Sequence, residues 1–145
     1  MVRQRAYFDT SVLMKRYVQE DGSAQARALL RRYRFLSSAI APLEALSALY
    51  RRHVAGEIAD QDLVGLVSRI QRDRGYWELI EMSPEVLARA EQVIKDTTLR
   101  TLDAIHVASV ILFQSDSGIR VPLITADSRQ REGARRLGLD VIWLD

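Results

Sequence analysis

Apolar residues along the chain form two kinds of segment. Short runs rich in apolar residues, typical of strands, alternate with longer stretches in which apolar residues recur every three or four positions, typical of helices. The short runs predict strands at about residues 4–8, 34–38, 76–82, 121–125 and 140–144. The longer stretches predict helices at about residues 11–18, 24–33, 40–55, 61–75, 84–96, 101–114 and 128–137.

Residues at the ends of these segments support the predicted boundaries. Ser83 and Pro84 are typical of a helix cap and a first helical turn, and Asp60 is placed to cap the helix predicted at 61–75. Gly138 stands just past a predicted helix end. Strands that alternate with helices indicate a mainly parallel sheet covered on both faces. We therefore expect one domain over residues 1–145, an α/β/α sandwich with a mainly parallel sheet of about five short strands.

Four largely apolar segments each contain a single acidic residue. "AYFDTSVLM" contains Asp9 and "VPLITADS" contains Asp127, each following a predicted strand. "LSSAIAPLEALSALY" contains Glu44, and "TLDAIHVASVILFQS" contains Asp103, both in the first turns of predicted helices. In a parallel α/β sheet, the carboxyl ends of the strands and the N-termini of the following helices share one rim, where such folds bind ligands. We therefore expect the four carboxylates to meet at that rim.

Carboxylates that meet in a poorly solvated place repel one another, and one or more would take up a proton. A hard divalent cation removes this conflict, because Mg²⁺ and Mn²⁺ prefer carboxylate and water oxygens. The set therefore predicts a Mg²⁺ (or Mn²⁺) site. Taken one at a time, Asp9 and Asp127 are also good helix caps, and Asp103 could stabilise a helix dipole. Glu44 is harder to explain as a capping or dipole-stabilising residue, because its leucine neighbours predict a largely buried helix.

Composition narrows the class of protein. The sequence of 145 residues contains no cysteine, which excludes disulfides and zinc–thiolate sites. The net charge of +2 is too small to indicate nucleic-acid binding by itself. Of the 21 basic residues, however, all but Lys15 and Lys95 are arginine, which pairs well with phosphate. No apolar run approaches the roughly 20 residues that span a bilayer, and no signal peptide is recognised. We expect a cytoplasmic protein without membrane contact.

Four segments in order, "YFDTSVLMKRYVQEDGS", "LEALSAL", "LRTLDAIHVAS" and "LITADSRQREGARRLGL", resemble the PIN-domain ribonucleases. The closest likeness is to the toxins of bacterial VapBC-type toxin–antitoxin pairs. The resemblance spans the chain and implies a parallel-sheet α/β/α fold and metal-dependent endonucleolytic cleavage of RNA. The family's acids fall on Asp9, Glu44, Asp103 and Asp127, and the family commonly assigns Mg²⁺ to the first and third. It also implies a homodimer and a cognate antitoxin with a DNA-binding end.

The resulting hypothesis is hydrolysis of an RNA phosphodiester, in which a bound ion activates water and neutralises charge on the phosphate. Asp9 and Asp103 are expected to bind the ion directly, and Asp127 to complete its shell or hold a bound water. Glu44 is expected to orient the attacking water or to bind a second ion. The alternative from another class is a non-catalytic module of the same fold that binds RNA or protein. Metal-dependent cleavage separates the two.

Basic and polar residues near the acids are further candidates. Arg129 and Arg131 directly follow Asp127 and are expected to contact RNA phosphates, with Lys15 and Arg16 next. His106 lies one helical turn after Asp103, which suits a general base. Its apolar neighbours favour a hydrogen-bonded core histidine instead. The stretch "FQSDSGIR" (113–120) is longer and more polar than we expect before the last core strand of this family.

Overall fold

The computed structural model describes residues 2–145, so Met1 of the expected domain lies outside it. The strands of the described chain are β1 (Arg5–Phe8), β2 (Arg34–Ser38), β3 (Glu78–Ile80), β4 (Leu123–Thr125) and β5 (Val141–Trp143). Its helices are α1 (Thr10–Tyr17), α2 (Ser23–Arg32), α3 (Ala41–Val54), α4 (Asp60–Asp73), α5 (Pro84–Thr97), α6 (Thr101–Ser117) and α7 (Ser128–Arg136), with a 3₁₀ turn, η1 (Arg74–Tyr76).

The strands form one sheet in the order β3-β2-β1-β4-β5. All four strand pairings are parallel, which confirms the predicted fold class. The chain moves outward from β1 through β2 to β3 and later returns to the opposite side of β1 for β4 and β5. In parallel sheets, ligands commonly bind outside the carboxyl ends of the two strands where the strand order reverses, which are β1 and β4 here.

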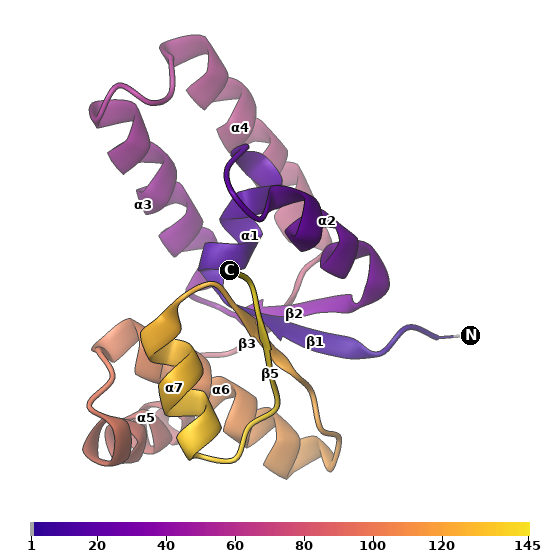
Figure 1. Ribbon diagram of the computed structural model, residues 1–145, viewed down its shortest axis with the longest axis vertical. Helices are drawn as coiled ribbons and strands as arrows, with labels where there is room; N and C mark the ends of the chain where they lie inside the picture. Colours follow the sequence, from indigo (N-terminus) through magenta and orange to yellow (C-terminus); the bar gives the residue numbers. More distant parts are fainter. Residues whose placement is uncertain (1) are drawn as a thin grey trace.

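Helices cover both faces of the sheet (Figure 1). On one face, α5, α6 and α7 pack over a core that includes Tyr7 of β1 and Leu123 of β4. On the other face, Ala6 and Phe8 of the same strand pack with residues of α1 and α2. The alternation along β1 follows from the two-residue period of a strand, which sends successive side chains to opposite faces.

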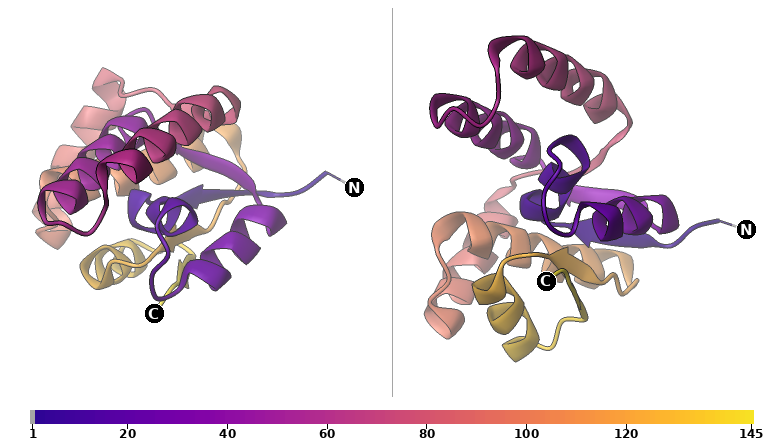
Figure 2. Two further views of the ribbon diagram at one scale, coloured as in Figure 1. Left: turned by 90° about the horizontal axis from the view of Figure 1, so that it is seen from above. Right: turned by 45° about the horizontal axis from the view of Figure 1, so that its top comes forward.

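Helices α3 and α4 form a pair that extends away from the sheet beyond α1 (Figures 1 and 2). Leu49 of α3 and Leu63 and Ile70 of α4 are buried there, in a cluster completed by Leu13 and Tyr17 of α1. The cluster anchors the pair to α1, and through α1 to the carboxyl end of β1. None of the helices within residues 2–145 is long and apolar enough to cross a membrane.

Several predicted boundaries differ from the structure. Asp60 is the first residue of α4 and not its cap, because Ala59 occupies the cap position without a side-chain bond. Helix α6 runs to Ser117, beyond the predicted end at residue 114, and stops where Gly118 adopts a left-handed φ of 71°. The predicted strand at 76–82 is shortened to β3, because η1 takes up its first residue.

Candidate active site

Asp9 is the N-cap of α1, as one interpretation of the sequence predicts, since its Oδ2 accepts the backbone N–H of Ser11 at 3.2 Å. The Ser11 hydroxyl donates to the same oxygen at 2.5 Å and accepts the backbone N–H of Ala126 at 3.2 Å. The other oxygen, Oδ1, accepts from Nε2 of Gln130 at 3.3 Å and lies 3.6 Å from Nε2 of His106. The carboxylate is therefore both a cap and a junction between β1, α6 and α7.

Asp127 is the N-cap of α7, with its Oδ1 accepting the backbone N–H of Gln130 at 3.0 Å. The capping interpretation is again confirmed. Asp103 lies in the first turn of α6, and the cap position of that helix belongs to Arg100. Asp103 and Asp127 line the same open cavity of about 330 Å³, together with Arg100 and Arg129. Two carboxylates from distant parts of the chain therefore face one space.

Glu44 is held from two sides. The Thr10 hydroxyl donates to its Oε1 at 2.8 Å, and Nε2 of His106 lies 2.6 Å from the same oxygen. The second ring nitrogen of His106, Nδ1, lies 2.6 Å from the hydroxyl of Tyr7. His106 has no exposed surface. The prediction of a buried, hydrogen-bonded histidine is confirmed, and one of its two partners, Glu44, belongs to the candidate site.

The four acids influence one another electrostatically. Burial, together with the negative charges of Asp127, Asp9 and Glu44 and against the opposing influence of His106, raises the pKa of Asp103 from 3.8 to about 6. Burial opposes a charge on His106, but its hydrogen bond with Glu44 and the nearby carboxylates outweigh burial and raise the pKa of the imidazole above 6.5. Asp103 therefore lies close enough to Asp127, Asp9 and Glu44 for their charges to act on it.

The donor set suits a hard cation in kind and in charge. Carboxylate oxygens that repel one another are the ligands that Mg²⁺ and Mn²⁺ favour. Beside Asp9, the buried Oε1 of Gln130 has no hydrogen-bond partner, so one further oxygen acceptor is left unused. Within residues 2–145, however, no three Asp, Glu, His or Cys side chains are arranged to hold a metal ion. Binding of an ion would therefore require these side chains to reorient.

The four basic residues predicted to contact substrate are placed differently from one another. Arg129 is exposed and lines two cavities with Asp103. Arg131 lines one of them, of about 470 Å³, while its guanidinium stacks 4.2 Å from the centre of the Trp143 ring. The remaining two are held elsewhere: Lys15 by Glu20 and the carbonyl of Asp21, and Arg16 by Asp73.

Two residues of the site went unrecognised in the sequence. Arg100 lines both cavities that Asp103 lines, and its position three residues before an isolated acid was the available signal. Gln130 is the second such residue, because its side chain is fully buried and donates to Asp9. No local pattern could reveal that bond, because it joins residues 121 positions apart.

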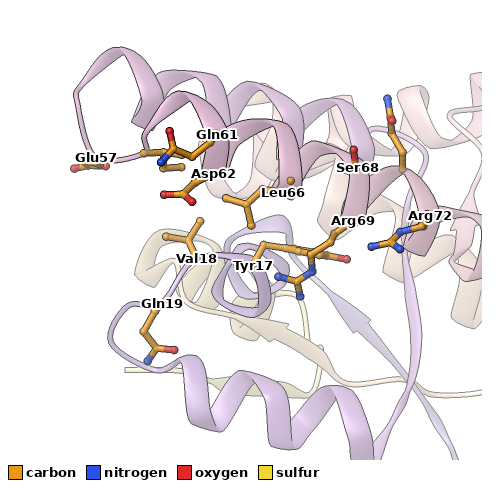
Figure 3. A pocket seen from close by; sticks show the side chains of 13 residues that line it. Tyr17, Val18, Gln19, Glu57, Gln61, Asp62, Leu66, Ser68, Arg69 and Arg72 are labelled. Carbon is orange, nitrogen blue, oxygen red and sulfur yellow. The ribbon is translucent and has the colours of Figure 1, made fainter.

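A wider cavity of about 1110 Å³ lies away from the acids, between the end of α1 and α4 (Figure 3). Tyr17 and Leu66 line it, and Arg69 lies over the Tyr17 ring at 5.2 Å from its centre. The Tyr17 hydroxyl donates to Asp73 at 2.5 Å. None of the four acids lines this cavity, so it is separate from the candidate active site.

Comparisons with known proteins agree with the fold. A family model described as PIN domain matches residues 6–136. VapBC2 from Rickettsia felis, bound to a DNA fragment from its promoter, is 12% identical with a TM-score of 0.68 over 98% of this chain and 100% of that chain. FitAcB from Neisseria gonorrhoeae is 14% identical, with a TM-score of 0.71 over 94% and 96%.

A toxin–antitoxin complex from Klebsiella pneumoniae is 19% identical, with a TM-score of 0.65 over 86% of this chain and 88% of that chain. At such identities the likeness concerns the fold alone. A comparison with curated proteins finds no significant match.

Proposed function

The chain belongs to the PIN-domain family, and on that basis we propose that it is a metal-dependent endoribonuclease that hydrolyses RNA phosphodiester bonds, and the toxin of a toxin–antitoxin pair. The observation that supports the activity most is the raised pKa of Asp103, about 6, to which the charges of Asp127, Asp9 and Glu44 contribute. A carboxylate whose charge is disfavoured by burial and by three neighbouring acids is costly for folding alone, and a cation would relieve that cost.

Each side chain has a proposed task that follows from its place. Asp9 and Asp103, with Asp127, would hold Mg²⁺ or Mn²⁺. A divalent ion, when bound, supplies Lewis acidity that activates water and neutralises charge developing on the phosphate. Glu44, restrained by Thr10 and His106, would orient the attacking water.

Arginine side chains at the cavity rim would receive the RNA. Arg129 and Arg100 line the same cavity as Asp103 and Asp127, so a phosphate they bind would lie beside the acids. Contacts of this kind position a nucleic acid without reading its sequence and weaken as salt rises. The proposed contacts therefore explain binding and not target choice.

An apolar stripe on α3 supports the proposal of protein partners. Leu43 is 70% exposed, Val54 is 86% exposed, and Leu46 and Tyr50 between them are 39% and 49% exposed. Spaced three to four residues apart, these side chains share one side of the helix. A homodimer or an antitoxin would cover such a surface. The solved neighbour from Klebsiella pneumoniae is a toxin–antitoxin complex by description.

The activity is tested by incubating purified protein with RNA in Mg²⁺, in Mn²⁺ and in EDTA, alongside Asp9→Asn and Asp103→Asn. Asparagine caps helices about as well as aspartate, so Asp9→Asn removes charge while sparing α1. Glu85→Gln, an exposed first-turn acid of α5, is the matched control. We expect metal-dependent cleavage by the wild type and the control only. Equal cleavage by the wild type and folded Asp9→Asn would end the proposal.

The non-catalytic alternative has one observation in its favour, since no metal-holding group of three side chains is formed within residues 2–145. Two results together would favour that alternative. The protein would bind RNA without cleaving it under every metal condition, and calorimetry would detect no Mn²⁺ binding that is lost in Asp103→Asn.

A further inference from the structure

His106 connects the core of the domain to the candidate site. Its Nδ1 lies 2.6 Å from the Tyr7 hydroxyl of β1, and its Nε2 lies 2.6 Å from Oε1 of Glu44 on α3. The two rings pack edge to face, with centres 5.7 Å apart and an interplanar angle of 75°. Because Tyr7 and His106 are both fully buried, the imidazole has little freedom to rotate or move.

The partners determine which ring nitrogen carries a hydrogen. An ionised carboxylate only accepts hydrogen bonds, so the short contact with Glu44 requires a hydrogen on Nε2. The Tyr7 hydroxyl suits either state of the opposite nitrogen, because it can donate to a bare Nδ1 or accept from a protonated one. Nε2–H therefore donates to Glu44 whether the imidazole is neutral or charged.

Glu44 would be poorly restrained without this bond. Its side chain is 22% exposed, and its only other protein donor among the described residues is the Thr10 hydroxyl, on the same oxygen. The nearby Asp9 carboxylate, 3.6 Å from Nε2 of His106, would favour rotation of Glu44 away from the acids. The histidine opposes that rotation because it places a donor beside both carboxylates.

We propose that His106 is a positioning residue: oriented by Tyr7, it holds the Glu44 carboxylate in the active site through Nε2–H. The kinetic part of this inference rests on the proposed nuclease function, whereas the hydrogen bond itself does not. Residues that orient a group bound to the reacting centre typically contribute about 10- to 100-fold to activity.

The first experiment observes the bond directly. The sequence has two histidines, so protein labelled with ¹⁵N-histidine gives only the ring signals of His106 and His53. We expect Nε2 of His106 to carry a hydrogen that exchanges slowly with solvent, and Glu44→Ala to shift that signal while leaving His53 unchanged. An Nε2 without a hydrogen in the wild type, or a His106 signal insensitive to Glu44→Ala, would overturn the proposal.

The second experiment measures RNA cleavage. His106→Met keeps the length of the side chain but removes the donor, and we expect kcat to fall about 10- to 100-fold with little change in KM. His106→Gln restores an N–H donor and should recover part of the loss. On a Glu44→Ala background the effect of His106→Met should largely disappear, because a residue acting through another has no effect once its partner is gone. The inference would be overturned if His106→Met lowered kcat by the same factor on the Glu44→Ala background, or if His106→Met alone had the kcat of the wild type.

Two further variants keep the outcome decisive. His53→Gln is the control. Nδ1 of His53 lies 2.8 Å from the carbonyl oxygen of Ile58, outside the candidate site, so the kcat of this variant should match that of the wild type. If His106→Met does not fold, Tyr7→Phe serves in its place, because it removes the hydroxyl that orients the ring but keeps the packing. It should move the Nδ1 signal and lower kcat, and no change in either would contradict the proposal. If the wild-type protein cleaves no RNA, the nuclease proposal fails, and the ¹⁵N spectrum alone decides whether His106 holds Glu44.

Discussion

Replacing Asp103 by asparagine should stabilise the metal-free protein near pH 8. The carboxylate is partly buried beside three other acids, which raises its pKa from 3.8 to about 6. At roughly 1.4 kcal/mol for each pKa unit, this rise limits the destabilisation by the ionised carboxylate to about 3 kcal/mol. Solvent screening of a partly exposed group reduces that destabilisation to about 1–1.5 kcal/mol. Losing a first-turn acid costs about 0.3–1 kcal/mol. The net gain therefore lies between about 0 and 1.2 kcal/mol, and its centre near 0.6 kcal/mol corresponds to a rise in Tm of about 1–2 °C.

The pH dependence follows from the direction of the shift. A pKa that is higher in the folded state means that the folded protein binds the proton more tightly. The contribution of Asp103 to stability is therefore fully present below pH 3.8 and is lost as pH rises through about 6. Asparagine does not titrate, so the advantage of Asp103→Asn should be absent near pH 4 and complete near pH 8.

Thermal unfolding followed by circular dichroism in EDTA, at pH 4, 6 and 8, measures this difference. Glu85→Gln is the control, because it also removes a first-turn acid but from an exposed position on α5. If Asp103→Asn melts below the wild type at pH 8 by as much as the control does, the reasoning is refuted. Added Mn²⁺ should reverse the order, since an ion that binds the folded wild type stabilises it by mass action.

Three further changes test other parts of the structure. Arg129→Ala should raise KM for RNA about three- to tenfold with kcat unchanged and reduce the salt dependence of binding, because it removes a proposed phosphate contact at the cavity of Asp103. Tyr17→Phe should cost about 1.5–3 kcal/mol in urea unfolding near neutral pH, because the hydroxyl donates to the Asp73 carboxylate. Burial and that hydrogen bond raise the pKa of Tyr17 above 10.0, so the wild type should lose stability as pH rises above 10, and the variant should lose less. Gly133→Ala should destabilise by about 1 kcal/mol or more in the same assay, because a Cβ there would lie 2.8 Å from Cδ1 of the buried Leu99.

Each of these changes has a matched control. Arg89→Ala removes an exposed arginine of α5 and should leave KM unchanged. Tyr76 is 92% exposed, so Tyr76→Phe should not alter stability. Gly65→Ala on α4 meets no atom within 4 Å and should stabilise the helix by about 0.5–1 kcal/mol. A control that behaves like its test variant would contradict the corresponding explanation.

Local features were readable from the sequence because they depend on residues a few positions apart. Ser83 caps α5 through the backbone N–H of Val86, and Asp9 and Asp127 cap α1 and α7, all as their spacing indicates. The period of the apolar residues located every strand and helix. It placed ends less well, as at Ser117, because a polar helix end and a polar loop have the same composition.

Long-range features were decided by the tertiary structure. The sequence by itself determined that the acids follow strands or begin helices, and hence that they would share an edge. Only the fold decided that β1 lies between β2 and β4 in the sheet. Only the fold paired His106 with Tyr7 and Glu44, 99 and 62 positions away, and directed Arg16 to Asp73. Such contacts arise when distant segments pack together. The period of apolar residues and the capping residues of a helix describe one segment at a time, so they carry no information about contacts between segments.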